Sequence, residues 1–286
     1  MSRSLSIIVP AYNEAARLGD SLQTILQYLN RHTQDGELIV VDDGSSDETA
    51  AVAERNLVDT GGVSVKLIRT RQNRGKGHAV RTGLLAARAP IAVFSDADLS
   101  TPINEMPKLI GPIERGECDL TFGSRALDRS LTIIHQPWRR EQGGKVFNLI
   151  VRLATGLPFW DTQCGFKAFR LRTCRPILEA ARIHRFGFDV ELLYVAHLAG
   201  LSLREIAVRW DHYEGSKVDV LRDSLRMLNE VRTIRSQARR GEYDEAIKAA
   251  RALAAQERER IEQDSGDTGS NENDLSTNLA GAARGA

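Results

Sequence analysis

The sequence predicts an α/β fold in which a mostly parallel β-sheet is flanked by helices. The first hundred residues alternate strand patterns with helix patterns, as expected where crossover helices join parallel strands. Three of the four strand patterns run into loops that carry Asp or Asn. The chain of 286 residues is 42% hydrophobic, which suffices for a sizeable buried core. Ligands of such sheets bind beyond the carboxyl ends of the strands, so we expect one site at these loops.

The first predicted strand is a short apolar run rich in β-branched side chains, which is typical of a strand buried on both faces. The four strands are expected at residues 5–9, 37–41, 63–68 and 91–94. Between them, apolar residues at helical spacing predict helices over residues 14–29, 47–56 and 77–87.

The C-terminal part of the chain differs in composition from the rest. We expect a basic amphipathic helix over residues 217–240 and a peripheral helix with a narrow apolar stripe over residues 241–264. Residues 265–286 carry almost no large apolar side chain, which predicts a disordered tail. The sequence therefore predicts one folded domain over residues 1–240, followed by the helix and the tail.

The net charge of +1 hides an uneven distribution. Residues 1–239 hold 33 Lys and Arg against 28 Asp and Glu, a net charge of +5, whereas residues 240–286 hold six against ten. This balance argues against nucleic-acid binding as the main function. Three Cys residues are too few for a disulfide framework, which favours a reducing compartment. They form no C-x-x-C pair, which argues against a structural zinc site and a thioredoxin-like motif.

Membrane insertion and secretion are not expected from the sequence. The longest interior stretch without an acidic or basic residue, 192–203, is too short for a spanning helix. The N-terminus turns polar too early for the apolar region of a signal peptide. We therefore expect a cytoplasmic protein.

Two acidic residues, Asp96 and Asp98, follow the fourth predicted strand with one residue between them. Alternate residues of an extended segment point the same way, so we expect the two carboxylates to lie together. Paired carboxylates suit Mg²⁺ or Mn²⁺, which in turn would hold a diphosphate. The alternative is that Asp98 caps a helix that starts near Ser100.

A second acidic pair, Asp42 and Asp43, ends the second predicted strand. A carboxylate at this place can accept a hydrogen bond from the ring N–H of a base such as uracil. The alternative is a turn followed by a helix N-cap.

Glycines flank Lys76 just before the third predicted helix, at Gly75 and Gly77. Their spacing is not that of a P-loop, which argues against a P-loop ATPase. Glycines at a helix start nevertheless leave backbone N–H groups for an anion, with Lys76 and Arg81 as phosphate partners.

Five segments occur in an order and spacing that resemble the inverting family-two glycosyltransferases. They are Ile8-Val9-Pro10-Ala11-Tyr12-Asn13-Glu14, Val41-Asp42-Asp43-Gly44-Ser45-Ser46-Asp47, Asn73-Arg74-Gly75-Lys76-Gly77, Asp96-Ala97-Asp98-Leu99 (the DxD motif) and Gly123-Ser124-Arg125. Residues 161–167 and 185–191 look like the dolichyl-phosphate β-glucosyltransferase branch of that family, and the resemblance covers about residues 5–235. It implies the A-type glycosyltransferase fold, which is Rossmann-like, and metal-dependent transfer of glucose from UDP-glucose to a polyprenyl phosphate with inversion.

The resemblance also implies roles for individual residues. Tyr12 would lie against the uracil, Glu14 near the ribose, and either Asp42 or Asp43 at the base edge. The other implied positions are Pro10, Ala11 and Asn13 in the nucleoside pocket, Asp96 and Asp98 at the ribose and the metal, Arg125 facing the phosphates, and Gln163, Gly165 and Lys167 near the sugar and the acceptor. Mannosyltransferases of the family often carry a Gln metal ligand where Ser100 stands here, which favours glucose over mannose.

The acceptor decides whether the reaction needs a general base. A phosphate monoester, with a second pKa near ~6, is largely ionised at neutral pH, whereas an alcohol needs a base. A lipid phosphate would instead need cations in the site. One alternative is a soluble transferase that acts on an alcohol with Asp161, Asp189 or Glu191 as base. Another is a nucleotide-sugar-binding protein without catalytic activity.

The segment 131–160 combines basic residues with Trp138, Phe147 and apolar residues at helical spacing. This pattern is typical of a helix at a membrane interface, and the alternative is an amphipathic helix packed on the sheet. We therefore expect a peripheral protein at the inner face of the membrane. Its partners would be a UDP-sugar donor, a polyprenyl phosphate acceptor and the membrane surface, and no nucleic acid.

Overall fold

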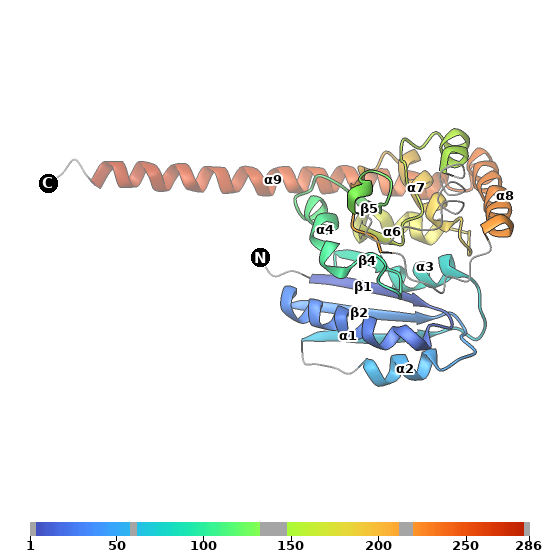
Figure 1. Cartoon of the computed structure of the whole chain (residues 1–286). Helices are drawn as coiled ribbons and strands as arrows, with labels where there is room; N and C mark the ends of the chain where they lie inside the picture. Colours follow the sequence, from blue (N-terminus) through green and yellow to red (C-terminus); the bar gives the residue numbers. More distant parts are fainter. Residues whose placement is uncertain (1–3, 58–61, 132–147, 212–219, 283–286) are drawn as a thin grey trace.

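The computed structural model describes residues 4–57, 62–131, 148–211 and 220–282 (Figure 1). The strands are β1 (Ser4–Ala11), β2 (Asp35–Asp42), β3 (Val63–Arg69), β4 (Ile91–Ser95), β5 (Leu120–Ser124), β6 (Phe166–Arg170) and β7 (Leu203–Ala207). The helices are α1 (Ala15–His32), α2 (Thr49–Asn56), α3 (Lys76–Ala86), α4 (Met106–Glu114), α6 (Leu171–Ala180), α7 (Phe188–Leu198), α8 (Val220–Arg239) and α9 (Asp244–Ala282). Two short 3₁₀ helices, η1 (Ile103–Glu105) and η2 (Arg129–Leu131), and a helix over residues 148–155 complete the described elements.

The alternating strands and helices of the first hundred residues are confirmed, with boundaries within a few residues of those predicted. The seven strands form one sheet in the order β3-β2-β1-β4-β6-β5-β7. Strands β3, β2, β1 and β4 are parallel, whereas β6 runs antiparallel to both β4 and β5. The strand order reverses at β1, which pairs with β2 on one side and β4 on the other. Such a reversal opens a crevice at the carboxyl ends of the strands.

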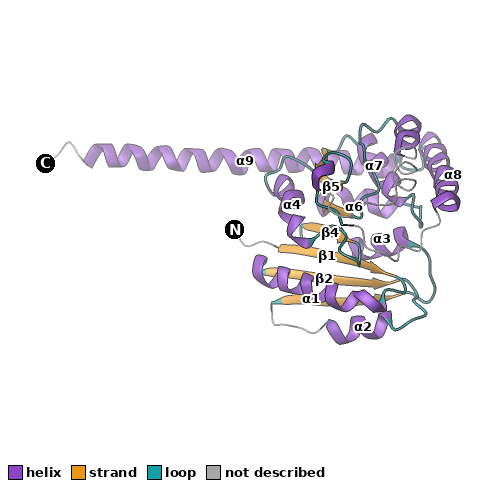
Figure 2. Ribbon diagram, in the orientation of Figure 1, coloured by secondary structure: helices purple, strands orange, loops and turns teal. Residues whose placement is uncertain are grey.

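Helices cover both faces of the sheet, and an apolar cluster lies on each face (Figure 2). Alternate residues of β1 enter opposite clusters because side chains of a strand point alternately to its two faces. Ile8 packs with residues of α3, α6 and α7, whereas Ile7 and Val9 pack with residues of α1 and α4. All three side chains are fully buried. The continuous apolar run in β1 follows from this burial on both faces.

The first half of α9 belongs to the folded body and packs against α6. Tyr243, just before α9, is buried and donates a hydrogen bond from Oη to Glu191 Oε1 at 2.6 Å. One turn after another, α9 then buries Ala250, Ala254 and Glu257. Residues 241–264, expected as a peripheral helix, are therefore tied to the body by buried apolar and polar contacts.

The helix does not end where the sequence analysis expects a disordered tail to begin, at residue 265. α9 continues as one helix to Ala282, and this part extends away from the rest of the protein (Figure 1). An α-helix satisfies its backbone hydrogen bonds internally, so a lack of apolar side chains removes tertiary packing without removing the helix. The division of the chain into a domain, a helix and a tail remains a prediction.

We expect truncation after Gln263 to change the free energy of unfolding by less than about 0.5 kcal/mol, because the removed part of α9 extends away from the body. Truncation after Arg240 removes the buried Tyr243, Ala250 and Ala254 and should cost more than about 3 kcal/mol. Urea denaturation followed by circular dichroism measures both values. Equal losses from the two truncations would contradict this assignment.

Candidate active site

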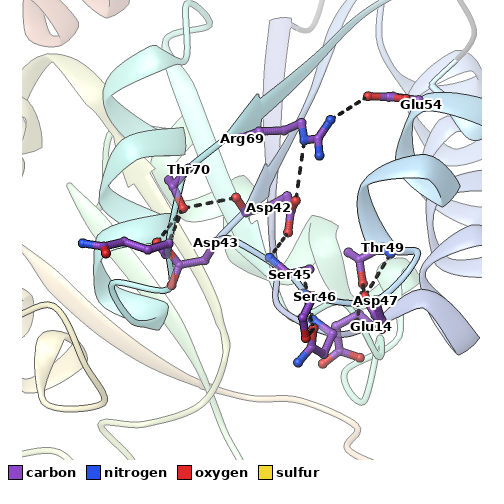
Figure 3. A network of polar contacts seen from close by, with 12 residues as sticks. Glu14, Asp42, Asp43, Ser45, Ser46, Asp47, Thr49, Glu54, Arg69 and Thr70 are labelled. Carbon is purple, nitrogen blue, oxygen red and sulfur yellow. Dashed lines mark hydrogen bonds and ion pairs between the residues drawn. The ribbon is translucent and has the colours of Figure 1, made fainter.

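Side chains join the loops that follow β1 and β2 (Figure 3). The N–H of Asn13 donates to Ser45 Oγ at 2.9 Å, and the N–H of Ser46 donates to Asn13 Oδ1 at 2.9 Å. The N–H of Glu14 donates to Thr49 Oγ1 at 2.8 Å. The polar ends of two neighbouring parallel strands therefore form one bonded surface, as the sequence predicts.

Two residues other than glycine at this edge of the sheet have a left-handed backbone. Asn13, after β1, has φ 55°, and Leu99, after β4, has φ 48°. Positive φ is tolerated by Asn but costly for Leu, whose side chain is larger. Such conformations concentrate at functional sites, and both residues lie in loops that the sequence analysis assigns to the site.

The loop after β1 presents Tyr12 to solvent and keeps its preceding neighbours inside. Tyr12 is 45% exposed, whereas Pro10 and Ala11 are buried in the last part of β1. The Glu14 carboxylate is bound by the guanidinium of Arg17, with Nη2 2.8 Å from Oε1. Pro10 and Ala11 thus support the loop from within the sheet, and the Tyr12 ring is open to a ligand.

The two carboxylates after β2 hold different loops. Asp43 Oδ2 accepts hydrogen bonds from the N–H groups of Arg74 at 3.0 Å and Gly75 at 2.6 Å. Asp42 Oδ1 accepts one from the N–H of Ser45 at 3.0 Å (Figure 3). Both acids are buried, so their first effect is to fix the loops around the crevice. The assignment of one of them to the base edge remains a prediction.

The glycines before α3 are required by packing. Gly75 has φ 110°, and a Cβ on it would overlap the carbonyl oxygen of His184. A Cβ on Gly77 would overlap the side chain of Phe188. The close approach that these glycines permit is therefore between α3 and the segment before α7, and not only toward an anion.

Arg81 does not join the other predicted phosphate partners. Its Nε donates to the carbonyl oxygen of Leu178 at 2.6 Å, and its Nη2 to that of Glu179 at 2.7 Å. These are carbonyls in the last turn of α6, where a cation is favoured by unpaired backbone oxygens. The prediction that Arg81 binds phosphate is replaced by a role in holding α6.

Asp96 and Asp98 follow β4 in a turn, not in the extended segment that the sequence analysis assumes, because the N–H of Leu99 donates to the carbonyl oxygen of Asp96 at 3.2 Å. Each of the two carboxylates faces a cation. Lys76 Nζ is 2.6 Å from Asp96 Oδ1, and Arg17 Nη1 is 3.7 Å from Asp98 Oδ2. Asp98 Oδ1 also accepts a hydrogen bond from the N–H of Ser100 at 2.9 Å. The next helix, η1, starts only at Ile103 and has no side-chain cap, so the alternative that Asp98 caps a helix is wrong. Ser21 of α1 fixes this loop by donating to the carbonyl oxygen of Ala97 at 2.7 Å.

The carboxylate of Asp96 lies directly against the backbone of Gly165. The N–H of Asp96 donates to the carbonyl oxygen of Gly165 at 3.1 Å. A Cβ on Gly165 would overlap the Asp96 carboxylate, so any other residue here would displace that side chain. The segment before β6 thus packs directly against the loop that carries Asp96, and its place near the sugar remains a prediction.

The Asp96 and Asp98 side chains suit a divalent cation. Both offer hard oxygen atoms, and their side chains are 35% and 23% exposed. A cation, the Lys76 ammonium, already neutralises Asp96. Burial acts to lower the pKa of Lys76, but the carboxylates of Asp96, Asp189 and Asp98 outweigh it and raise the pKa above its usual value.

Within the described part of the chain, no three His, Cys, Asp or Glu side chains come together as a metal site. A cation held by two carboxylates would therefore take its remaining ligands from water or from a bound diphosphate. This is the usual situation of Mg²⁺ in phosphate-transfer sites.

Arg125, at the end of β5, is held by Asp161. Its Nε and Nη2 lie 2.7 and 2.9 Å from the two carboxylate oxygens, and its guanidinium carbon lies 5.6 Å from the centre of the Trp210 ring. Burial acts to lower the pKa of Arg125, but the Asp161 carboxylate outweighs it and raises the pKa. Arg125 therefore stays charged at the edge of the crevice, with one third of its side chain exposed.

Lys167 is not in the crevice, contrary to the prediction that it contacts sugar or acceptor. Its side chain is fully buried in β6, where Nζ lies 2.6 Å from Asp189 Oδ1 and donates to the carbonyl oxygen of Cys164 at 2.6 Å. The reason is the register of the sheet, which places Lys167 opposite Phe94 of β4. Gln163 is half-buried, and its amide nitrogen lies 3.7 Å from Met227 Sδ of α8.

Sequence reasoning missed two residues that shape the site. Arg17 pairs with Glu14 and faces Asp98, and the spacing of Glu14 and Arg17 on the first turn of α1 would have indicated the pair. Glu205 on β7 accepts hydrogen bonds from Ser124 Oγ at 2.6 Å and from the N–H of Asp161 at 2.8 Å. It thereby aligns Arg125 with its partner, and no local pattern marks it.

The model of the family described as glycosyl transferase family 2 matches residues 6–172. The chain belongs to glycosyl transferase family 2. Among similar proteins, the dolichyl-phosphate beta-glucosyltransferase of Dictyostelium discoideum is 34% identical over 240 residues, which are 81% of this chain and 73% of that protein. The human protein of the same name is 35% identical over 231 residues, 76% of this chain and 70% of that protein. The resemblance seen in the motifs is confirmed, and the chain is a glycosyltransferase.

The fold is similar to that of glucosyl-3-phosphoglycerate synthase from Mycobacterium tuberculosis. The two structures superpose with a TM-score of 0.56 at 21% sequence identity, covering 80% of this chain and 78% of that chain. That crystal structure contains Mn²⁺, UDP and glucosyl-3-phosphoglycerate. The prediction of the A-type glycosyltransferase fold is confirmed.

We expect Gly165→Ala to preserve the fold of this glycosyltransferase and to displace the Asp96 carboxylate. The overlap is with the end of a short, partly exposed side chain, which can rotate away. Transfer activity should fall by about 10-fold or more, because misplacement of a positioned group by ~1 Å is costly. The control is Gly111→Ala in α4, where a new Cβ meets only the Arg115 guanidinium at 3.1 Å. Equal activity of the two variants would contradict the assignment of Asp96.

Proposed function

We propose that this glycosyltransferase moves glucose from UDP-glucose to a polyprenyl phosphate, with inversion and with Mg²⁺ or Mn²⁺ held by Asp96 and Asp98. Relatives that carry this activity in their names match most of the chain. The observation that carries the proposal is a set of three cations at one edge of the sheet. Arg17, Lys76 and Arg125 each contact a carboxylate there, and two phosphate-bearing substrates would need such charges.

On the donor side, the open ring of Tyr12 would stack on the uracil, and Asp42 or Asp43 would accept its ring N–H. A divalent cation bound at Asp96 and Asp98 would stabilise the charge on the leaving diphosphate. Lys76 and Arg125 would add positive charge for the same purpose.

On the acceptor side, each of the three carboxylates considered as a base already binds a cation or hydrogen-bond donors. Asp161 binds Arg125, and Asp189 lies 2.6 Å from the Lys167 ammonium. Glu191 is fully buried and accepts hydrogen bonds from the N–H groups of residues 182 and 183 and from Tyr243 Oη. These contacts argue against an alcohol acceptor that uses one of these bases. An ionised phosphate needs no base to attack the anomeric carbon.

We further propose that the protein meets its lipid substrate at the membrane surface. No helix in the described part of the chain combines the length and hydrophobicity needed to cross a bilayer. The helix over residues 148–155 nevertheless exposes Leu149 and Leu153, the latter by 78%, and Trp160 beyond it is 56% exposed. The guanidinium carbon of Arg152 lies 3.9 Å from the centre of the Trp160 ring. Exposed apolar side chains beside a cation suit an anionic leaflet, such as the inner face of the membrane.

Residues 132–147, which hold most of the basic and aromatic positions expected at the membrane interface, lie outside the described part of the chain. The proposed contact therefore rests on residues 148–160.

Radiolabelled glucose supplied as UDP-glucose should enter the organic phase when the protein is incubated with polyprenyl phosphate and Mn²⁺, and EDTA should abolish this transfer. Asp98→Asn should reduce it by about 100-fold or more, because a ligand of the cation loses its charge. The control is Asp20→Asn, which changes an exposed acid elsewhere on α1. Label that reaches only water-soluble products would contradict a lipid phosphate acceptor.

Vesicles that contain anionic lipid should carry the protein upward in a flotation gradient. Leu153→Asp should reduce the floating fraction by about 3-fold or more, because it places a charge where an apolar side chain would enter the interface. Leu198→Asp, at an exposed leucine on α7, is the control and should float like the unchanged protein. Flotation of both variants at the level of the unchanged protein would contradict the proposed surface.

A further inference from the structure

The ion pair between Lys76 and Asp96 occupies an oxygen that a divalent cation would use. Lys76 Nζ lies 2.6 Å from Asp96 Oδ1, and both side chains remain partly exposed, by 24% and 35%. Lys76 is the first residue of α3, whereas Asp96 follows β4, so the contact joins two separate elements. We propose that Lys76 is a displaceable counter-ion, which leaves Asp96 when the divalent cation binds and then pairs with the diphosphate of the donor.

The charges around Lys76 support exchange rather than a permanent bond. Three carboxylates attract its ammonium, those of Asp96, Asp189 and Asp98. A second cation on Asp96 Oδ1 would be strongly repelled by an ammonium at hydrogen-bond distance. The ammonium has to move when that oxygen becomes a metal ligand.

Once Lys76 leaves Asp96, neither of the other two carboxylates that attract it is an equally good partner. Asp189 attracts it, but Asp189 Oδ1 already lies 2.6 Å from the Lys167 ammonium, and burial raises the pKa of Asp189 despite that contact. Asp98 faces Arg17 and would itself bind the divalent cation. The released ammonium therefore finds its strongest new partner in the donor diphosphate.

This exchange makes cation binding and donor binding mutually dependent. Without nucleotide, the divalent cation has to break the Lys76–Asp96 pair, which weakens its binding. With nucleotide, the displaced ammonium gains the diphosphate, so each ligand strengthens the binding of the other by the same factor. Lys76 thus acts as a positioning and coupling residue, and this role rests on the proposed function.

The test measures Mn²⁺ binding without nucleotide and UDP binding with Mn²⁺ present, both by calorimetry. For Lys76→Met we expect Mn²⁺ to bind about 5-fold more tightly or better, and UDP to bind about 5-fold more weakly or worse. Lys76→Gln, which keeps a polar contact to Asp96 without the charge, should shift both affinities in the same directions. Lys76→Arg keeps the charge and should leave Mn²⁺ affinity within about 2-fold of the unchanged protein.

The matched control is Lys108→Met. It removes an ammonium that lies 2.6 Å from a carboxylate, that of Glu105, outside this charge group. It should change neither affinity. Thermal unfolding of each variant checks that the fold is kept, which we expect because the Lys76 side chain is partly exposed.

The outcomes separate this inference from the proposed function. If the unchanged protein binds neither Mn²⁺ nor UDP, the proposed function fails. If it binds both, and Lys76→Met and Lys76→Gln leave Mn²⁺ affinity unchanged or weaken it, the counter-ion role is overturned while the proposed function stands. Tighter Mn²⁺ binding together with weaker UDP binding supports the exchange, since loss of a merely structural lysine would not move the two affinities in opposite directions.

Discussion

The contact between the Asp96 carboxylate and the backbone of Gly165 fixes the geometry of the whole crevice. It joins the loop after β4 to the segment before β6, and a side chain at Gly165 would displace the Asp96 carboxylate. On one side of Gly165, Asp161 holds Arg125. On the other side, Lys167 binds the carbonyl oxygen of Cys164 and reaches the carboxylate of Asp189. One close approach therefore sets where the DxD loop, the arginine and the buried lysine lie relative to one another.

Lys167 and Asp189 have a structural task that explains why they are charged although they are buried. A buried lysine is costly unless it is paired and hydrogen-bonded, and Lys167 has both kinds of partner within 2.6 Å. Its ammonium lies under the segment that carries Gly165, so the pair stiffens the wall against which Asp96 rests. An apolar pair could fill the same volume, but it could not bind the Cys164 carbonyl oxygen that faces the interior.

Much of the fold follows from local pattern, whereas the contacts of the site do not. Residues 5–9 and 37–41 predict strands because four of the five side chains in each range are apolar and most of these are β-branched, and the sheet buries both faces of them. The same patterns place Asp43, Asp96 and Asn13 in loops at one edge. The prediction for Lys167 is wrong because its motif carries no information on the strand register, which places Lys167 opposite Phe94 inside the sheet. Arg81 was misplaced because its partners are carbonyls of α6, 97 and 98 residues away in the chain.

The tail beyond residue 264 illustrates a different limit of sequence reasoning. Its composition predicts that it has little to bury, and the helix in this part extends away from the body (Figure 1). Burial and helix formation are separate questions, however, because the helical hydrogen bonds need no partner from the rest of the fold.

The acidic residues of the crevice act mainly by holding cations. Glu14 binds Arg17, Asp96 binds Lys76, and Asp161 binds Arg125. A site built for an alcohol acceptor would need one of its acids free to take a proton, and its pKa would have to suit that task. Here burial acts to raise the pKa of Asp161, but Arg125 outweighs it and lowers the pKa, which makes Asp161 a weaker base. Carboxylates that orient cations suit a reaction in which both substrates carry phosphate groups. The negative charges of these phosphates are present before any bond breaks, and the oriented cations can balance them from the start.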